Sequence, residues 1–159
     1  TAVVCAVEGS RPLVTEVQAL VGRPTPGTPG RTCVGLDRNR VALLAAVLEK
    51  AGLTLSDRDL YVNAAGGVRL EETAADLGVI AALASSMRDR PVRGDTAMFG
   101  EVGLVGEVRA VPNPALRLRE AARHGFRRVI APAACVGDAP AGLEVLGVRT
   151  VKEALGQAF

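Results

Sequence analysis

Three hydroxyl side chains near the middle of the chain are of the right type to attack a carbonyl group: Thr73, Ser85 and Ser86. A threonine or serine becomes a nucleophile when a neighbouring amine or imidazole takes its proton. Each of the three also has a structural interpretation. Thr73 precedes a strongly apolar run and suits the cap or first turn of a helix. The two serines suit the last turns of that helix, where their hydroxyls bond backbone carbonyls. We favour the structural interpretation for all three.

The bases that such a nucleophile needs are scarce. The sequence has two lysines, Lys50 and Lys152, which lie in other predicted helices, and one histidine, His124. His124 precedes Gly125 at a predicted helix end, where a cation interacts favourably with the helix dipole. No Ser/His/Asp set can be assembled from these residues, so the spacing predicts no local catalytic triad.

Composition restricts the classes of function further. The chain is 48% hydrophobic over 159 residues, which is enough for one compact α/β domain. Three phenylalanines, one tyrosine and no tryptophan leave the core to alanine, valine and leucine. The same scarcity argues against a surface that stacks the bases of RNA or of single strands on aromatic rings. Any contact with nucleic acid is therefore expected to be electrostatic.

The cysteines bear on the cellular compartment of the protein and do not predict a metal site or a disulfide. Cys5, Cys33 and Cys135 are odd in number and widely spaced, which matches neither a metal-ligand pattern nor a disulfide framework. Cys5 and Cys135 lie in apolar segments and are expected to be small core residues. A reducing cytoplasm is the predicted location. No apolar stretch is long enough to span a bilayer, so no membrane contact is expected.

Arginine is concentrated in one part of the sequence. The net charge is only +2, but the segment from Arg88 to Arg128 holds nine arginines and five acidic residues, an excess of four positive charges. This pattern is typical of a solvated surface and equally of a surface that binds phosphate groups. The candidates for direct DNA contact are Arg88, Arg90, Arg93, Arg117, Arg119 and Arg123.

The order of predicted elements is that of an α/β protein with an opening β-hairpin. Turn-forming residues join two strand-like runs, and a loop rich in proline and glycine follows them. This loop is either passive or a contact to DNA or to another subunit. Asp37 is a good N-cap for a helix that ends at Gly52, and Asn113 and Pro114 open another helix. The predicted strands are 2–7, 13–20, 32–36, 60–64, 97–99, 101–104, 107–111, 129–131 and 143–146, the loop is 22–30, and the other helices are 73–87 and 150–158.

Two longer segments resemble the proteolytic domain of the Lon family, a Ser-Lys peptidase. The chain reads EETAADLGVIAALASSMRDRPV from Glu71 and FGEVGLVGEVRAVPNPALRLREAARHG from Phe99. Aligned without a gap, the nucleophilic serine of that family falls on Ala74 and its catalytic lysine on Arg117. The glycine that follows the nucleophile in Lon falls on Asp76. The resemblance therefore extends to the segments that surround the catalytic site but not to the catalytic residues themselves.

Each of these replacements opposes peptide hydrolysis. Ala74 has no heteroatom and cannot attack a carbonyl carbon. Arg117 stays protonated at any ordinary pH and cannot act as a base. Asp76 brings negative charge to a place where a developing oxyanion needs hydrogen-bond donors. The resemblance thus implies that this domain is not an enzyme, with Ala74 and Arg117 as a degenerate dyad. The alternative is an active serine or threonine peptidase of Lon-like fold with a displaced nucleophile, Thr73 or Ser85.

Among Lon-like sequences, this combination most resembles the C-terminal domain of the bacterial RadA (Sms) family of DNA repair and recombination proteins. The nearest competitors are ComM and other magnesium-chelatase-like ATPases. The resemblance implies an α/β (α+β) Lon proteolytic-domain-like fold, similar to ribosomal protein S5 domain 2, with mixed sheets packed with helices. It implies one domain over residues 1–159, the C-terminal part of a longer ATPase-containing protein. ATP, Mg and Zn are then expected only in the N-terminal part, and no cofactor in this domain.

The resemblance also implies a homo-hexameric ring that scaffolds the ATPase and contacts single-stranded or branched DNA during recombination and branch migration. A ring presents several copies of each arginine surface, so weak phosphate attraction is multiplied by avidity. Such contacts are to backbone phosphates and carry little base specificity.

Overall fold

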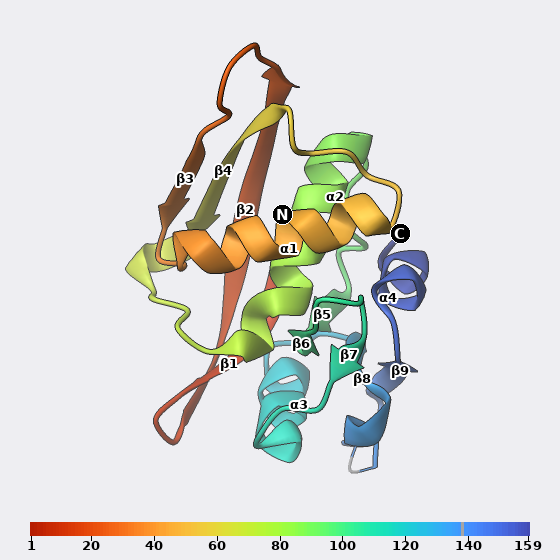
Figure 1. Cartoon of the computed structure of the whole chain (residues 1–159). Coiled ribbons are helices and arrows are strands. Elements are labelled where there is room, and N and C mark those ends of the chain that lie inside the picture. Colours follow the sequence, from red (N-terminus) through yellow and green to blue (C-terminus); the bar gives the residue numbers. More distant parts are fainter. Residues whose placement is uncertain (138) are drawn as a thin grey trace.

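A seven-stranded mixed sheet lies at the centre of the computed structural model, which describes residues 1–137 and 139–159. The strand order is β3-β4-β2-β1-β5-β8-β9, and β6 pairs with β7 in a second, smaller sheet (Figure 1). The strands are β1 (Ala2–Glu8), β2 (Arg11–Pro24), β3 (Arg31–Val34), β4 (Arg58–Ala64), β5 (Thr96–Met98), β6 (Glu101–Val102), β7 (Val108–Arg109), β8 (Arg128–Pro132) and β9 (Glu144–Val148). The helices are α1 (Arg38–Lys50), α2 (Asp76–Arg88), α3 (Pro114–Arg123) and α4 (Val151–Ala158), with 3-10 turns η1 (Ala65–Gly67), η2 (Thr73–Ala75) and η3 (Ala133–Cys135).

The relative direction of neighbouring strands in the large sheet changes at β1. On one side β1, β2 and β4 pair antiparallel, starting from the predicted hairpin in which Glu8 faces Arg11. On the other side β1, β5, β8 and β9 all run parallel. Parallel strands need crossover connections, and α3 lies in the chain between β5 and β8. The mixed α/β fold class predicted from the sequence is confirmed.

Helices cover the two faces of the sheet unequally. Side chains that point to one face, such as Val4 and Met98, join a core with α1, α2 and α4. Side chains that alternate with them, such as Cys5 and Phe99, join a second core with α3. Figure 1 shows α1 and α2 crossing the same face of the sheet, with α3 near the end of the sheet where α2 begins. The Cys5 and Cys135 side chains are buried, as predicted.

The predicted boundaries hold where the signal is local. Asp37 caps α1 by accepting from the backbone N–H groups of Asn39 and Arg40 at 3.4 and 3.3 Å. The loop predicted at 22–30 begins later than expected, because residues 22–24 belong to β2. Pro24 at the end of this strand pairs with Arg58 of β4, and the Arg58 side chain donates a hydrogen bond of 3.1 Å to the carbonyl of Gly22.

Two predicted helix caps differ from the structure. Residues 73–75 form a 3-10 turn before α2, and the hydroxyl of Thr73 donates to Glu101 rather than capping a backbone group. Asn113 precedes α3 as predicted, but it adopts a left-handed conformation with φ of 58° and its side chain makes no capping bond. The second of these helices, α3, starts at Pro114 as predicted, whereas α2 starts at Asp76, three residues later than predicted.

Gly78 sets how closely α2 approaches the sheet. A Cβ atom at this position would overlap Cγ1 of Val4 on β1. The absent side chain lets the first turns of α2 lie directly on β1, which fixes the position of the segment that precedes the helix. That segment carries Ala74 of the degenerate dyad.

Candidate functional site

Ala74 lies in the 3-10 turn η2 and faces the interior. It is 2% exposed and belongs to the core that includes Cys5, Phe99 and Leu118. Its carbonyl accepts a hydrogen bond of 2.9 Å from the backbone N–H of Gly100. The position that holds the nucleophile in the resembled family is therefore a buried methyl group, held in place by packing and by a backbone bond.

Arg117 is the largest fully buried side chain of the described residues, with 1% of its side chain exposed. Its two terminal nitrogens donate to the two carboxylate oxygens of Glu72 at 2.6 and 2.9 Å. It also donates to the carbonyls of Cys5 at 3.0 Å and Pro112 at 2.9 Å. Its guanidinium carbon lies 5.8 Å from the ring centre of Phe99. A planar guanidinium is the one cation that can satisfy this many acceptors in fixed directions.

The burial of Arg117 corrects its prediction as a DNA contact. The side chain points into the core from the inner side of α3, and its charge is neutralised by Glu72. The same carboxylate accepts a further hydrogen bond of 2.8 Å from the backbone N–H of Val7. Glu72 therefore ties η2, α3 and the end of β1 together, a role that sequence reasoning missed. The one signal in the sequence was an acidic residue two positions before the residue aligned with the nucleophile.

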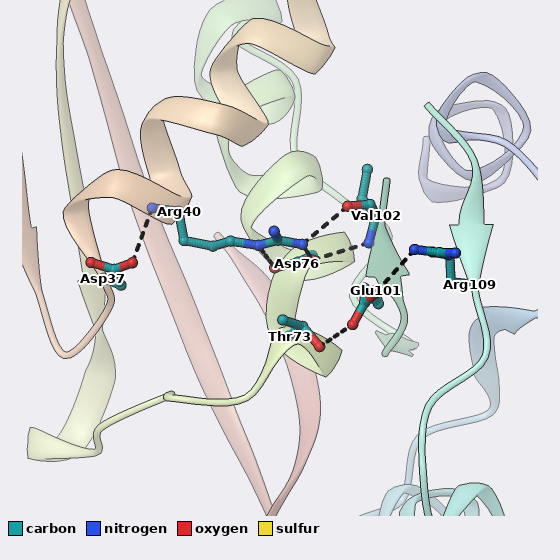
Figure 2. Close-up of polar contacts among 7 residues, drawn as sticks. All are labelled: Asp37, Arg40, Thr73, Asp76, Glu101, Val102 and Arg109. Atoms are coloured by element: carbon teal, nitrogen blue, oxygen red, sulfur yellow. Dashed lines mark hydrogen bonds and ion pairs between the residues drawn. The ribbon is translucent and has the colours of Figure 1, made fainter. Parts of the chain in front are cut away.

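Asp76 starts α2 and forms a second buried ionic contact. It is 2% exposed and pairs with Arg40 of α1, whose Nε lies 3.0 Å from the carboxylate (Figure 2). The carboxylate also accepts from the N–H of Val102 at 3.0 Å, and Arg40 donates to the carbonyl of Val102 at 3.0 Å. Burial raises the pKa of Asp76, and the hydrogen bond from Arg40 opposes the shift. The carboxylate oxygens that would repel an oxyanion are thus used to join α1, α2 and β6.

Thr73 is the one exposed hydroxyl of the site. Figure 2 shows its side chain directed to Glu101, which accepts its hydrogen bond and lies 3.9 Å from Arg109. The described residues place no lysine or histidine in this chain of contacts. His124 is held elsewhere, 2.9 Å from Glu120 on its own helix. Thr73 therefore contacts a carboxylate and no amine.

Both serines have structural roles, but only Ser85 makes the bond to a backbone carbonyl that was predicted for both. Ser85 is 6% exposed and donates to the carbonyl of Arg90 at 2.6 Å. Ser86 accepts from the backbone N–H of Val21 at 2.9 Å. The burial of Ser85 is incompatible with its prediction as a displaced nucleophile, because substrate cannot reach the oxygen.

Hollows surround the segment that leads to the degenerate dyad. One of about 430 Å³ is lined by residues of the β1–β2 turn and by residues 69–72, and Glu8, Glu71 and Glu72 are among them. Another of about 480 Å³ includes Asp37 and Glu71. Arg69 lines both hollows and Arg38 lines the second, so the carboxylates there lie beside cations.

The five accessible arginine candidates form two groups instead of one surface. Arg119 and Arg123 lie on the outer side of α3, and both are exposed. Arg88 ends α2, and Arg90 and Arg93 follow it in the chain. Figure 1 shows α3 near the start of α2, so the end of α2 lies about 18 Å away along that helix. The predicted single arginine surface is therefore divided into an α3 group and a group at the end of α2.

Potential metal ligands do not cluster in the part of the chain that the structure describes. In residues 1–137 and 139–159, no three side chains of the ligand types His, Cys, Asp and Glu gather as a metal site would require. The described helices include none with the length and hydropathy needed to cross a membrane. The three cysteines are free, and burial raises the pKa of Cys5 to about 12.

Comparisons with known proteins give the chain a family. The DNA repair protein RadA of Escherichia coli (strain K12) is 51% identical over 150 residues, which is 93% of this chain and 33% of that protein. Proteins of the same name from Pseudomonas aeruginosa and Bacillus subtilis (strain 168) are 49% and 47% identical, over 96% and 98% of this chain and 34% of each relative. The chain thus spans about a third of the length of these relatives and is homologous to RadA over nearly all of its own length. A family model described as "Subunit ChlI of Mg-chelatase" matches residues 23–135, more than two thirds of the chain, and the chain belongs to that family.

Proposed function

We propose that this chain is a Lon-like domain without peptidase activity in a RadA-type DNA repair protein, where it assembles into a hexameric ring and contacts DNA. The observation that carries the proposal is the contact between Arg117 and Glu72. It fills the place of a catalytic base with a buried, neutralised and permanent cation. The homology to proteins named DNA repair protein RadA supports the assignment to DNA repair.

The absence of catalysis follows from what each atom of the site can do. Hydrolysis through a Ser-Lys dyad needs an oxygen nucleophile and an amine that accepts its proton. Ala74 supplies neither, and the Nε and both terminal nitrogens of Arg117 already donate to protein oxygens. A guanidinium cannot release a proton at ordinary pH. The residues that would perform the chemistry hold the fold together instead.

The α3 group is the surface that we propose for DNA. Arg119 and Arg123 are four positions apart and share one side of the helix, and Arg127 follows shortly after it. The side chain of Arg123 is 77% exposed and only loosely paired, with Glu120 at 3.7 Å. Exposed arginines of this kind attract backbone phosphates without reading base sequence. In a ring, each copy adds the same surface, so the attraction adds up along a bound strand.

A salt titration of the complete protein tests the DNA contact. The affinity for a fluorescein-labelled oligonucleotide should fall steeply with salt, and the double variant Arg119→Glu, Arg123→Glu should flatten the dependence. The slope of log K against log salt falls by about 0.7 for each phosphate of a single strand that the protein no longer binds. The variant Arg38→Glu, Arg69→Glu makes the same change in charge in the hollow of about 480 Å³, which both residues line, and should keep the parent slope.

Two further measurements complete the test. Light scattering with and without DNA should give the mass of a hexamer, and a monomer that binds DNA equally well would contradict the ring. The variant Arg88→Glu, Arg90→Glu tests the group at the end of α2. If that variant flattens the salt dependence and the α3 variant does not, the DNA surface proposed for α3 is wrong.

One observation keeps a peptidase as the second candidate. Thr73 has an accessible hydroxyl that is bound to Glu101, a carboxylate that could take a proton. We expect neither casein cleavage nor labelling by a fluorophosphonate, because among the described residues no amine accompanies this pair. Cleavage that disappears in the Thr73→Ala variant would establish the peptidase.

A further inference from the structure

Two adjoining hollows lie at the side of the molecule where the ends of α1 and α2 meet α4. The first, of about 540 Å³, is lined by Ala51, Arg88, Arg90, Lys152, Leu155, Gly156 and Phe159. The second, of about 180 Å³, is lined by Val47, Lys50, Ala51, Val105, Gly106, Thr150, Val151 and Lys152. Ala51 and Lys152 line both, so the two hollows adjoin, and together we call them the α1–α4 groove. It is separate from the degenerate dyad and from the α3 group.

The groove carries positive charge that the described residues do not neutralise. Both lysines of the chain line it, together with Arg88 and Arg90, and none of the four forms an ion pair within residues 1–137 and 139–159. No carboxylate side chain is among the described residues that line either hollow.

The acidic side chains nearest in the sequence are engaged elsewhere. Glu49 accepts hydrogen bonds from the backbone N–H groups of Leu55 and Ser56. Glu153 accepts from the backbone N–H of Arg149 at 2.9 Å. Asp89 lies between Arg88 and Arg90 in sequence but lines neither hollow. Arg90 donates a hydrogen bond of 2.9 Å to the main-chain oxygen of Phe159, so the cations of the groove that remain open to an outside anion are Arg88, Lys50 and Lys152.

The second hollow is mainly aliphatic, and an exposed apolar turn borders it. Its lining includes Val47, Ala51 and Val151 beside Val105, which is 89% exposed at the tip of the β6–β7 hairpin. The neighbouring Leu104 is 68% exposed. Leu104 and Val105 thus place two adjacent exposed apolar side chains at the edge of a hollow that two lysines also line.

We propose that the α1–α4 groove binds an acidic peptide segment of a partner protein. Its carboxylates contact Arg88 and Lys152, and an aliphatic side chain beside them enters the hollow next to Val105. Clusters of arginine are a recurrent means of binding acidic motifs, and bidentate contacts to carboxylates give them direction. The inference goes beyond DNA binding and does not depend on it, because it uses neither Arg119 nor Arg123.

The apolar half of the groove favours a peptide over a nucleic acid. Phosphates would satisfy the same cations, but a nucleotide has no aliphatic side chain to fill the hollow at Val105. Bases bind by stacking on aromatic rings. Phe159 is the aromatic residue of the lining, and its ring already has the guanidinium carbons of Arg88 and Arg90 at 5.3 and 5.7 Å from its centre.

Fluorescence anisotropy with the complete protein tests the inference. The probe is a fluorescein-labelled peptide of four aspartates followed by three leucines. One control peptide carries asparagines in place of the aspartates, and another carries serines in place of the leucines. The first peptide should bind and both controls should bind at least tenfold more weakly, because each lacks one of the two contacts. The same measurements are made with an oligonucleotide probe.

Variants locate the binding. Arg88→Glu with Lys152→Glu should weaken peptide binding tenfold or more, and Val105→Ser, which changes no charge, should weaken it through loss of the apolar contact. Arg38→Glu, in the separate hollow of about 480 Å³ that Arg38 lines, should leave it unchanged. Peptide binding that is absent, or that all variants leave intact, overturns the inference. A groove variant that loses oligonucleotide affinity while keeping peptide affinity also overturns it and assigns the groove to nucleic acid.

Discussion

Breaking the Arg117–Glu72 contact should destabilise the fold, and by unequal amounts according to which partner is removed. Removing one member of a buried ion pair costs about 3–5 kcal/mol, because the other charge stays uncompensated. Glu72 has 28% of its side chain exposed and can regain water, whereas Arg117 has 1% exposed and cannot. We therefore expect about 3 kcal/mol for Arg117→Met and about 4 kcal/mol for Glu72→Gln.

The double variant measures the contact itself. Arg117→Met with Glu72→Gln leaves no unpaired charge, so its destabilisation should be smaller than the sum of the two single values by about 2–3 kcal/mol. Urea denaturation of the chain at neutral pH, followed by circular dichroism, gives the three free energies of unfolding. For a domain of this size the Arg117→Met variant should also melt roughly 6–12 °C lower. Strict additivity, or an Arg117→Met variant as stable as the parent, would refute the reasoning.

Three smaller predictions concern the elements that frame the site. Gly78→Ala should cost about 1–3 kcal/mol through overpacking against β1, whereas Gly156→Ala in α4, whose Cβ would meet no atom, should be neutral or slightly stabilising on thermal denaturation. A thiol-reactive dye at pH 8 should label half-buried Cys33 in the folded chain. Buried Cys5, whose pKa is about 12, should react only after unfolding. Rapid reaction of more than one thiol in the folded chain would contradict this. The pKa of Asp76 is higher in the folded chain than in the unfolded chain. At pH values between these two pKa values the folded chain binds more protons than the unfolded chain. The contribution of Asp76 therefore lowers the free energy of unfolding as pH rises through that range. Asp76→Asn should remove that part of the pH dependence, and an unchanged dependence of unfolding on pH would show that another group causes it.

Elements with local signals could be predicted from the sequence. The cap at Asp37 and the opening hairpin depend on neighbouring residues only, and both are present. Thr73 lies in the turn that leads into α2, which is one of the two places predicted for it, but it does not cap the helix, because its hydroxyl donates to Glu101, 28 residues away. Reasoning from neighbouring residues does not include Glu101, so it could not show that the Thr73 hydroxyl bonds this distant carboxylate instead of a nearby backbone group.

The contact of Arg117 shows the same limit more sharply. Arginine is seldom buried unless it is paired, so a helix carrying Arg117, Arg119 and Arg123 is expected to present a basic surface. Its partner Glu72 is 45 residues away and belongs to the other matched segment. The alignment of the two segments identified the position of Arg117, but only the three-dimensional arrangement shows that the side chain turns inward.

The inward direction of Arg117 bears on the DNA surface proposed for α3. The inner side of this ten-residue helix is fixed to Glu72, Cys5 and Pro112 through one guanidinium, while Arg119 and Arg123 point outward. An ordered helix presents its outer cations without first giving up the conformational freedom that a mobile segment would give up on binding. Arg117→Met should therefore lower DNA affinity although residue 117 touches no phosphate. The slope of affinity against salt should stay unchanged, because the number of bound phosphates is the same. A reduced slope in this variant would instead mean that the α3 group is displaced when the guanidinium no longer anchors the helix.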